Sequence, residues 1–181
     1  NCLVINPDEG ADHNPDSNVK IVRYETSDSG GIAVADTHEL YAGKATDARR
    51  GFFCTDNRQS LVIRDEISLS GESDVYWFMQ TAASVELTDS GAILTRGGKK
   101  LLLEAVADCE FEISSGRSVP LTTSPVMPND KMPDLNRIAI KLHTSGDTSL
   151  TVKLTPYEID GTRIIDYHKS IDEWSSDCIH K

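Results

Sequence analysis

The stretch Arg49–Leu103 reads RRGFFCTDNRQSLVIRDEISLSGESDVYWFMQTAASVELTDSGAILTRGGKKLLL. It consists of short apolar or alternating runs, and each run ends at a cluster of Gly, Asn, Asp or Ser, the residues that turns prefer. Such spacing is typical of consecutive β-strands and leaves little room for a helix. A long series of strands can bury its apolar sides only in two stacked sheets or a barrel. We therefore predict an all-β fold of stacked antiparallel sheets, a β-sandwich or supersandwich.

The same pattern extends outward on both sides of this stretch. The expected strands are Asn1–Asn6, Val19–Thr26, Gly31–Asp36, Arg50–Thr55, Gln59–Ile67, Asp74–Thr81, Ser84–Leu87, Ala92–Arg96, Lys100–Val106, Cys109–Ser114, Arg137–His143 and Ser149–Leu154. Segments Pro7–Asn18, Thr37–Ala48 and Pro120–Pro133 are expected to be loops, because turn residues and prolines are frequent in them. Asp56-Asn57-Arg58 and Gly97-Gly98 are expected to form hairpin turns.

A single domain, 1–181, is the expectation from the chain length. Only the tail, 155–181, favours a helix, and a short one. Ser170-Ile171-Asp172-Glu173 has the spacing of a capping box, in which Ser and Glu each satisfy a backbone N–H at the start of a helix. The residues expected on one face of this helix are Ile171, Trp174, Ser175 and Cys178.

The charge balance excludes some classes of partner. The chain carries 18 basic and 29 acidic residues, a net charge of −11. Long-range attraction to nucleic acid or to an anionic membrane is therefore not expected. The apolar runs are too short to cross a bilayer. With no initiator Met and no visible signal peptide, we expect the chain to be a piece of a longer protein.

Four cysteines, Cys2, Cys54, Cys109 and Cys178, are widely spaced, and three pairings are possible. The sequence holds no Cys-x-x-Cys, which excludes a zinc ribbon. We interpret Cys109 as a buried free thiol, with a disulfide as the alternative in an oxidising compartment.

Several short motifs imitate functional sites. Asp28-Ser29-Gly30-Gly31 resembles the segment around a protease nucleophile, but its residues are also those of an ordinary turn. Asp12-x-Asn14-x-Asp16 begins like an EF-hand loop, but Ser17 and Arg23 occupy the positions that need Gly and Glu. A solvated loop is the better interpretation, with an opportunistic calcium site as the alternative.

The five histidines show no metal-ligand spacing. Asp36 and His38 share one side of an extended segment, for which a surface hydrogen bond is favoured over a metal site. We assign no catalytic residue and no metal ligand in this chain.

Basic and aromatic residues supply the candidates for a ligand contact. Neighbours Arg49 and Arg50 must point to opposite faces of a strand. Arg96, Lys99 and Lys100 form a second basic spot, and ordinary solvated charge is the favoured interpretation for both groups.

The aromatic run is the other candidate. Tyr76 and Phe78 share one strand face, while Trp77 and Met79 share the other. One face is expected in the core. An exposed ring could stack on a sugar, and packing of both faces between sheets is the alternative.

These residues resemble the C-terminal β-rich domain of the heparinase II/III-like polysaccharide lyases. The matching stretches, in order, are Asn1–Ile5, Arg49–Phe53, Leu61–Ile67, Val75–Ala83, Gly91–Leu94, Lys99–Leu103 and Thr122–Pro128. The resemblance implies a larger enzyme with an N-terminal helical toroid, which cleaves uronic-acid polysaccharides such as heparin, heparan sulfate or alginate by β-elimination in a cleft between the two domains. It also implies a zinc site in many family members.

The chain departs from the family pattern at two places. The His that precedes the family's counterpart of Asn1 is not in this chain, and Gln80 stands where many relatives have His. We therefore transfer no catalytic or zinc-binding residue, and we expect no cofactor in this chain. The candidates for carbohydrate contact are Arg49, Arg50, Tyr76, Trp77 and Gln80.

The resulting hypothesis is an inactive C-terminal domain that forms one wall of a polysaccharide cleft and needs the missing toroid. The parent is expected to be secreted or periplasmic. The alternative is a non-catalytic carbohydrate-binding or structural, adhesion-type β-sandwich.

Overall fold

Strands dominate the residues that the computed structural model describes, which are 3–7, 12–119, 134–158 and 169–175. The strands are β1 (Leu3–Ile5), β2 (Lys20–Ser27), β3 (Gly30–Asp36), β4 (Ala45–Thr55), β5 (Ser60–Leu69), β6 (Ser73–Thr81), β7 (Ser84–Thr88), β8 (Gly91–Arg96), β9 (Lys99–Ala107), β10 (Phe111–Arg117), β11 (Asn136–Thr144) and β12 (Asp147–Pro156). Two short 3-10 turns, η1 (His38–Tyr41) and η3 (Ile171–Glu173), accompany them.

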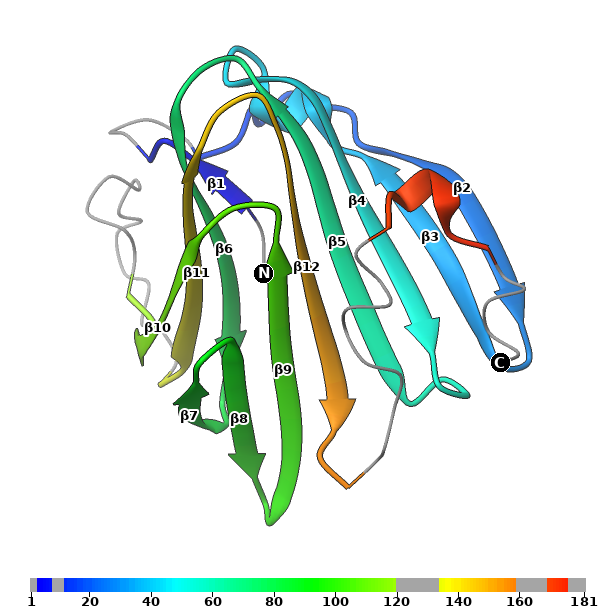
Figure 1. Ribbon diagram of the computed structural model, residues 1–181, viewed down its shortest axis with the longest axis vertical. Helices are drawn as coiled ribbons and strands as arrows, with labels where there is room; N and C mark the ends of the chain where they lie inside the picture. The colour runs from blue at the N-terminus through cyan, green and yellow to red at the C-terminus, as the bar shows by residue number, and fades with distance from the viewer. Residues whose placement is uncertain (1–2, 8–11, 120–133, 159–168, 176–181) are drawn as a thin grey trace.

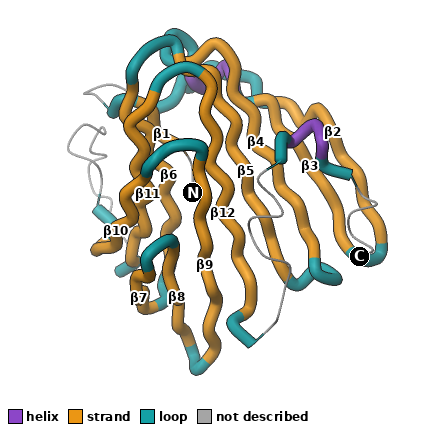
Figure 2. Tube along the Cα trace, in the orientation of Figure 1, coloured by secondary structure: helices purple, strands orange, loops and turns teal. Residues whose placement is uncertain are grey.

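The strands form two antiparallel sheets of unequal size (Figure 1). The small sheet has four strands in the order β1-β6-β11-β10, and the large sheet has eight in the order β2-β3-β4-β5-β12-β9-β8-β7. The tube in Figure 2 shows the same layers with strand over most of the described length. The predicted all-β sandwich is confirmed.

The main core lies between the two sheets. Alternate residues of β6 and β11 point into it, among them Trp77 and Ile140, which are 2% and 0% exposed. Leu150 and Val152 of β12 face them from the large sheet. We call the side of the large sheet that carries these two residues its inner face, and the opposite side its outer face.

A second, smaller core lies on the outer face of the large sheet. Its members are Ile32, Val34, Phe53, Val62, Ile171 and Trp174. The last two come from the tail, which packs against β3, β4 and β5. Ser170 and Glu173 form the predicted capping box. The expected helix is limited to the single turn Ile171–Glu173, because Trp174 is already extended (φ −67°, ψ 138°). The expected partner position Cys178 lies outside the described residues.

Two other expectations can be compared with the backbone. The expected loop Thr37–Ala48 is wrong in its second half, because β4 begins at Ala45, which pairs with Leu69. The expected glycine turn is confirmed, since Gly97 and Gly98 have φ of +57° and +76°, which suits glycine best.

Candidate functional site

Part of the large sheet's inner face extends beyond the sandwich core. Figure 1 shows β2 and β3 on the side of the molecule away from the small sheet. The register runs from Ile21 and Tyr24 of β2, through β3, β4 and β5, to Leu150 and Val152, so both β2 residues lie on the inner face. Ile21 is 61% exposed and Tyr24 72% exposed. We call this region of β2, β3 and β4 the open inner face.

A cleft of about 440 Å³ lies on the same side of the sheet. Its lining residues are His13, Asn14, Pro15, Ser17, Thr37, Leu40, Tyr41, Arg50 and Asp65. They come from the segment before β2, from η1 and from the middle of β4 and β5. The cleft therefore combines a guanidinium, a carboxylate, an imidazole and a phenol.

Arg50 and Asp65 form the charged floor of this cleft. They pair across β4 and β5, with Arg50 Nε 2.6 Å from Asp65 Oδ1 and Arg50 Nη2 2.9 Å from Asp65 Oδ2. The two parallel hydrogen bonds fix the guanidinium in one orientation. Burial raises the pKa of the Asp65 carboxyl above its ordinary value, and the positive charges of Arg50 and Arg64 oppose this shift. The Arg50 charge is already matched inside the protein.

Tyr41 and His13 line the cleft beside this pair. Their rings meet edge to face with centroids 5.5 Å apart. Both side chains reach the carbonyl of Leu3, with Tyr41 Oη at 3.3 Å and His13 Nε2 at 2.6 Å. Because a carbonyl accepts only, His13 Nε2 must carry a proton in this contact. The phenol and the imidazole are of the types that serve as bases, but here they donate to the backbone of β1.

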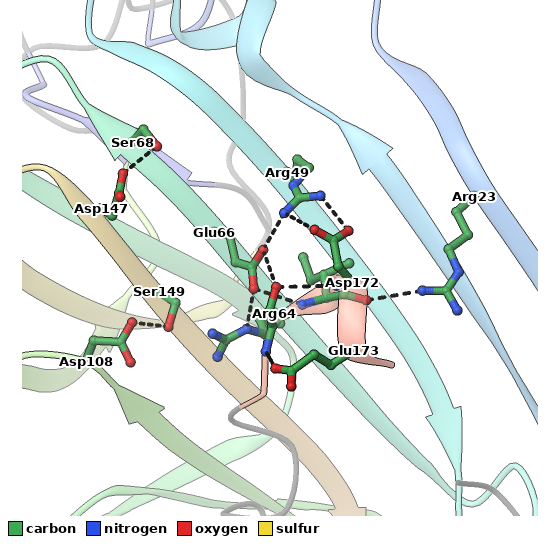
Figure 3. Close-up of polar contacts among 12 residues, drawn as sticks. Arg23, Arg49, Arg64, Glu66, Ser68, Asp108, Asp147, Ser149, Asp172 and Glu173 are labelled. Atoms are coloured by element: carbon green, nitrogen blue, oxygen red, sulfur yellow. Dashed lines mark hydrogen bonds and ion pairs between the residues drawn. The ribbon is translucent and has the colours of Figure 1, made fainter. Parts of the chain in front are cut away.

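Arg49 points to the outer face, as predicted for a neighbour of Arg50 (Figure 3). Its Nη2 lies 2.9 Å from Glu66 Oε2, and its Nη1 lies 2.8 Å from Asp172 Oδ1. The hydrogen bond from Arg49 lowers the pKa of the Asp172 carboxyl and, reciprocally, raises the pKa of Arg49. Arg49 therefore holds the tail against the sheet.

The three candidates from the aromatic strand lie on β6 of the small sheet, where Trp77 pairs with Leu3 of β1. Trp77 is buried in the main core between the two sheets. Tyr76 and Phe78 stack on the opposite face at 5.7 Å, confirming the predicted alternation. Lys141 and Arg137 of β11 lie over these two rings, at 5.5 Å and 4.9 Å. A sugar could stack there only after these cations moved.

Gln80 also lies on β6, opposite Arg137 in the register. The five sequence candidates thus divide among the cleft (Arg50), the outer face of the large sheet (Arg49), and the small sheet (Tyr76, Trp77 and Gln80). Sequence reasoning missed Tyr41 and Asp65 in the cleft. The predicted hairpin between β4 and β5 could have placed Asp65 beside Arg50, but only if the pairing register of the two strands had been known.

The remaining motifs behave as local structure. His38 Nδ1 lies 2.8 Å from Asp36 Oδ1, the surface hydrogen bond favoured above. Asn14 Oδ1 accepts from the N–H of Asp16, as in an ordinary polar turn. Lys100 Nζ lies 5.3 Å from the centre of the Tyr157 ring.

Cysteine and metal chemistry can be judged only for the described part of the chain. Cys54 and Cys109 are half-buried free thiols, in agreement with the preferred interpretation of Cys109 as unpaired. Cys2 and Cys178 lie outside the described residues. In the four described ranges, no group of three or more His, Cys, Asp or Glu side chains could hold a metal ion.

Comparison with known proteins shows a similarity in fold. No protein-family model matches the sequence, and no curated protein matches it. A crystal structure of heparinase III matches with a TM-score of 0.56 at 16% identity, over 80% of this chain and 22% of that chain. The heparan sulfate lyase HepC from Pedobacter heparinus matches with a TM-score of 0.62 at 9% identity, over the same shares. This chain has the fold of part of heparinase III.

This chain spans about a fifth of the length of these two structures, 22% of each. The expected resemblance in fold is confirmed. Within the described residues, no helix is long and apolar enough to cross a membrane.

Proposed function

We propose that this chain is the β-sandwich domain of a larger lyase that degrades uronic-acid polysaccharide by β-elimination. The observation that supports it is the fold likeness, which covers 80% of this chain but only 22% of heparinase III and of the heparan sulfate lyase. A sandwich that accounts for about a fifth of such enzymes is expected to work with a further domain. The family resemblance of the sequence implies that this domain is a helical toroid.

The open inner face supports the presence of such a partner. Its edge strand and the residue before it expose large apolar side chains: Val19 (42%), Ile21 (61%), Val22 (57%) and Tyr24 (72%). Apolar groups gathered at an unpaired sheet edge usually mark an interaction surface. We propose that the toroid covers this face and that the cleft containing Arg50 becomes one wall of the polysaccharide groove.

We propose that the sandwich does not catalyse the reaction alone, and the pairing of its charges supports this. β-Elimination beside a carboxylate needs a base, and a positive group that stabilises the negative charge developing there. Arg50 is matched by Asp65, and Arg49 by Glu66 and Asp172. Tyr41 donates to a backbone carbonyl. We infer that the base and the neutralising group come from the missing domain, and that the parent protein is secreted or periplasmic.

An activity assay tests this proposal. The 181-residue chain is mixed with heparin, heparan sulfate or alginate, and the ultraviolet absorbance of the unsaturated uronide product is followed. We expect no product from this chain, and product from the full-length protein. Turnover by the chain alone would refute the division of roles. A full-length protein inactive on all uronic-acid polymers would refute the proposed activity.

The role of the cleft is tested in the full-length protein. Arg50→Gln is expected to reduce kcat/KM by about tenfold or more, equivalent to about 1.4 kcal/mol, if the cleft contacts the polysaccharide. Arg117→Gln, whose side chain is 73% exposed on β10 of the small sheet, is the matched control and is expected to leave the rate unchanged. Equal rates for the two variants would remove Arg50 from the groove.

A further inference from the structure

The tail segment Ser170–Trp174 occupies a built site on the outer face of the large sheet. We call this region of β2, β3, β4 and β5 the tail site. Its hydrogen bonds join residues that are 104 to 151 positions apart in sequence, for example Glu66 with Ser170 and Arg23 with Trp174. Figure 3 shows the segment lying across the sheet with polar side chains of three strands pointing toward it.

The floor of the tail site is shaped for one indole ring. A Cβ placed on Gly51 would lie 2.6 Å from Cζ3 of Trp174 and 3.1 Å from Cγ1 of Ile171. No side chain larger than hydrogen fits there without a shift of the ring. Phe53 packs against the same ring, with centroids 5.5 Å apart. Ile171 and Trp174 are 1% and 5% exposed, so the chain's own tail occupies the tail site.

Polar side chains at the rim of the tail site bind both backbone groups and a side chain of the segment. Arg23 donates to the carbonyls of Trp174 at 2.6 Å and Ile171 at 3.2 Å. Glu66 accepts from the N–H of Ile171 at 2.9 Å. Arg49 binds both carboxylate oxygens of Asp172, at 2.8 Å and 3.1 Å. Together these contacts specify an Asp two residues before a Trp, in one chain direction.

We propose that the tail site is a peptide-recognition surface, and that the partner it fits is the Ser170–Trp174 segment of a second copy of this chain. Thirteen residues, 157–169, connect β12 to the segment, and they can reach roughly 45 Å when extended. A segment from another copy would make the same contacts as the chain's own. Exchange between two copies therefore loses no contact and is limited only by concentration. The proposal does not depend on the lyase activity.

The concentration that favours exchange can be estimated. A tethered segment competes at an effective concentration in the millimolar range. Free copies therefore exchange tails appreciably only as the protein approaches about 1 mM. Trp and Arg are the residue types that dominate such small interfaces, so Trp174 and Arg49 are expected to carry most of the affinity.

Two experiments on the full 181-residue chain test the proposal. In the first, sedimentation of the wild-type chain is followed up to about 1 mM. We expect a reversible dimer that disappears in Trp174→Ala and that excess capped peptide 169–175 dissociates. A wild-type chain that stays monomeric throughout the series would overturn the exchange, as would a dimer insensitive to the peptide.

In the second experiment, fluorescence anisotropy follows the labelled peptide 169–175 on the Trp174→Ala chain. We expect saturable binding, about tenfold or more tighter than on the wild-type chain, whose own tail competes. A peptide with Asp172→Asn is expected to bind more weakly. A folded Trp174→Ala chain that binds no peptide would refute the recognition surface. Should this variant not fold, Asp172→Ala replaces it, since Asp172 has a side chain 72% exposed.

Discussion

Gly51 shows how one residue determines what can pack on a sheet. It is a strand residue whose missing side chain leaves room for Trp174 on the outer face. The same strand carries Arg49 and Arg50, which sit on either side of the sheet within two positions of it. A close backbone approach is a common reason for glycine inside a strand.

Gly51→Ala is expected to reduce the free energy of unfolding by about 1–3 kcal/mol, because the new methyl group overlaps the Trp174 ring. Urea unfolding monitored by tryptophan fluorescence measures the change. Gly116→Ala is the matched control, since a Cβ there meets nothing within 4 Å, and its effect should stay within about 0.5 kcal/mol. Equal effects of the two substitutions would contradict the packing of the tail.

The residue patterns predicted which face of a strand each side chain occupies, but not which residue lies opposite it on the neighbouring strand. The two-residue period of a strand placed Arg49 and Arg50 on opposite sides, and the structure confirms it. The partner of Arg50 depended on a turn length. A three-residue turn at Asp56–Arg58 would pair Arg50 with Arg64, whereas pairing of Thr55 with Ser60 brings Asp65 opposite it. A shift of one residue exchanges all partners, so register could not be taken from composition.

At the scale of elements, most strands could be predicted because runs of apolar residues and turn signals are local. The capping box at Ser170 was also local, and it is present. The contacts of the tail were not predictable, because Asp172 and Arg49 are 123 positions apart and only the folded sheet brings them together. The cleft was missed for the same reason, since Tyr41 of η1 and Asp65 of β5 are distant in sequence and line one cleft only in the folded chain.

β6 and β11 carry an exposed charge cluster that should make their pairing depend on pH. His143 lies opposite Asp74, with Nδ1 2.8 Å from Asp74 Oδ1 and Nε2 3.1 Å from Glu72 Oε1. Its hydrogen bond to Asp74, then that to Glu72, raise the pKa of His143 above its ordinary value. Asp74, which also pairs with Lys141, has its pKa lowered, chiefly by His143.

The sign of the effect follows from these two shifts. The His143 contribution to stability is complete below its unfolded pKa of about 6.5 and is lost as pH rises through the folded value. The Asp74 contribution is lost as pH falls through its lowered value. Compared with His143→Gln, the wild-type chain should therefore gain stability only between these two limits. Urea midpoints across the pH range and an NMR titration of His143 measure it. A His143 pKa at or below 6.5 would contradict the cluster.

At the scale of the whole molecule, the open inner face should promote aggregation on heating. Exposed apolar residues at the sheet edge favour contact between copies, whereas their loss changes little in the folded monomer. Ile21→Ser with Tyr24→Ser is expected to reduce aggregation on heating and to change the free energy of unfolding by less than about 0.5 kcal/mol for each site. Light scattering and urea unfolding measure the two quantities.

A buried residue supplies the comparison for this variant. Ile138 is 0% exposed in the main core, and Ile138→Ala should reduce the free energy of unfolding by about 2–5 kcal/mol. A double variant of the edge that is destabilised to a similar degree would mean that Ile21 and Tyr24 are packed inside the protein. They would then not form the surface that we propose for a partner domain.

The unequal width of the two sheets divides the molecule into a thick half and a thin half. In the thick half the four-stranded sheet covers the large sheet, and side chains of both sheets form the main core between them. The thin half is one layer of backbone, with the tail packed on its outer face and with Ile21, Val22 and Tyr24 exposed on its edge strand β2. A neighbour that binds along β2 can therefore bury these side chains while the described contacts of the tail stay in place.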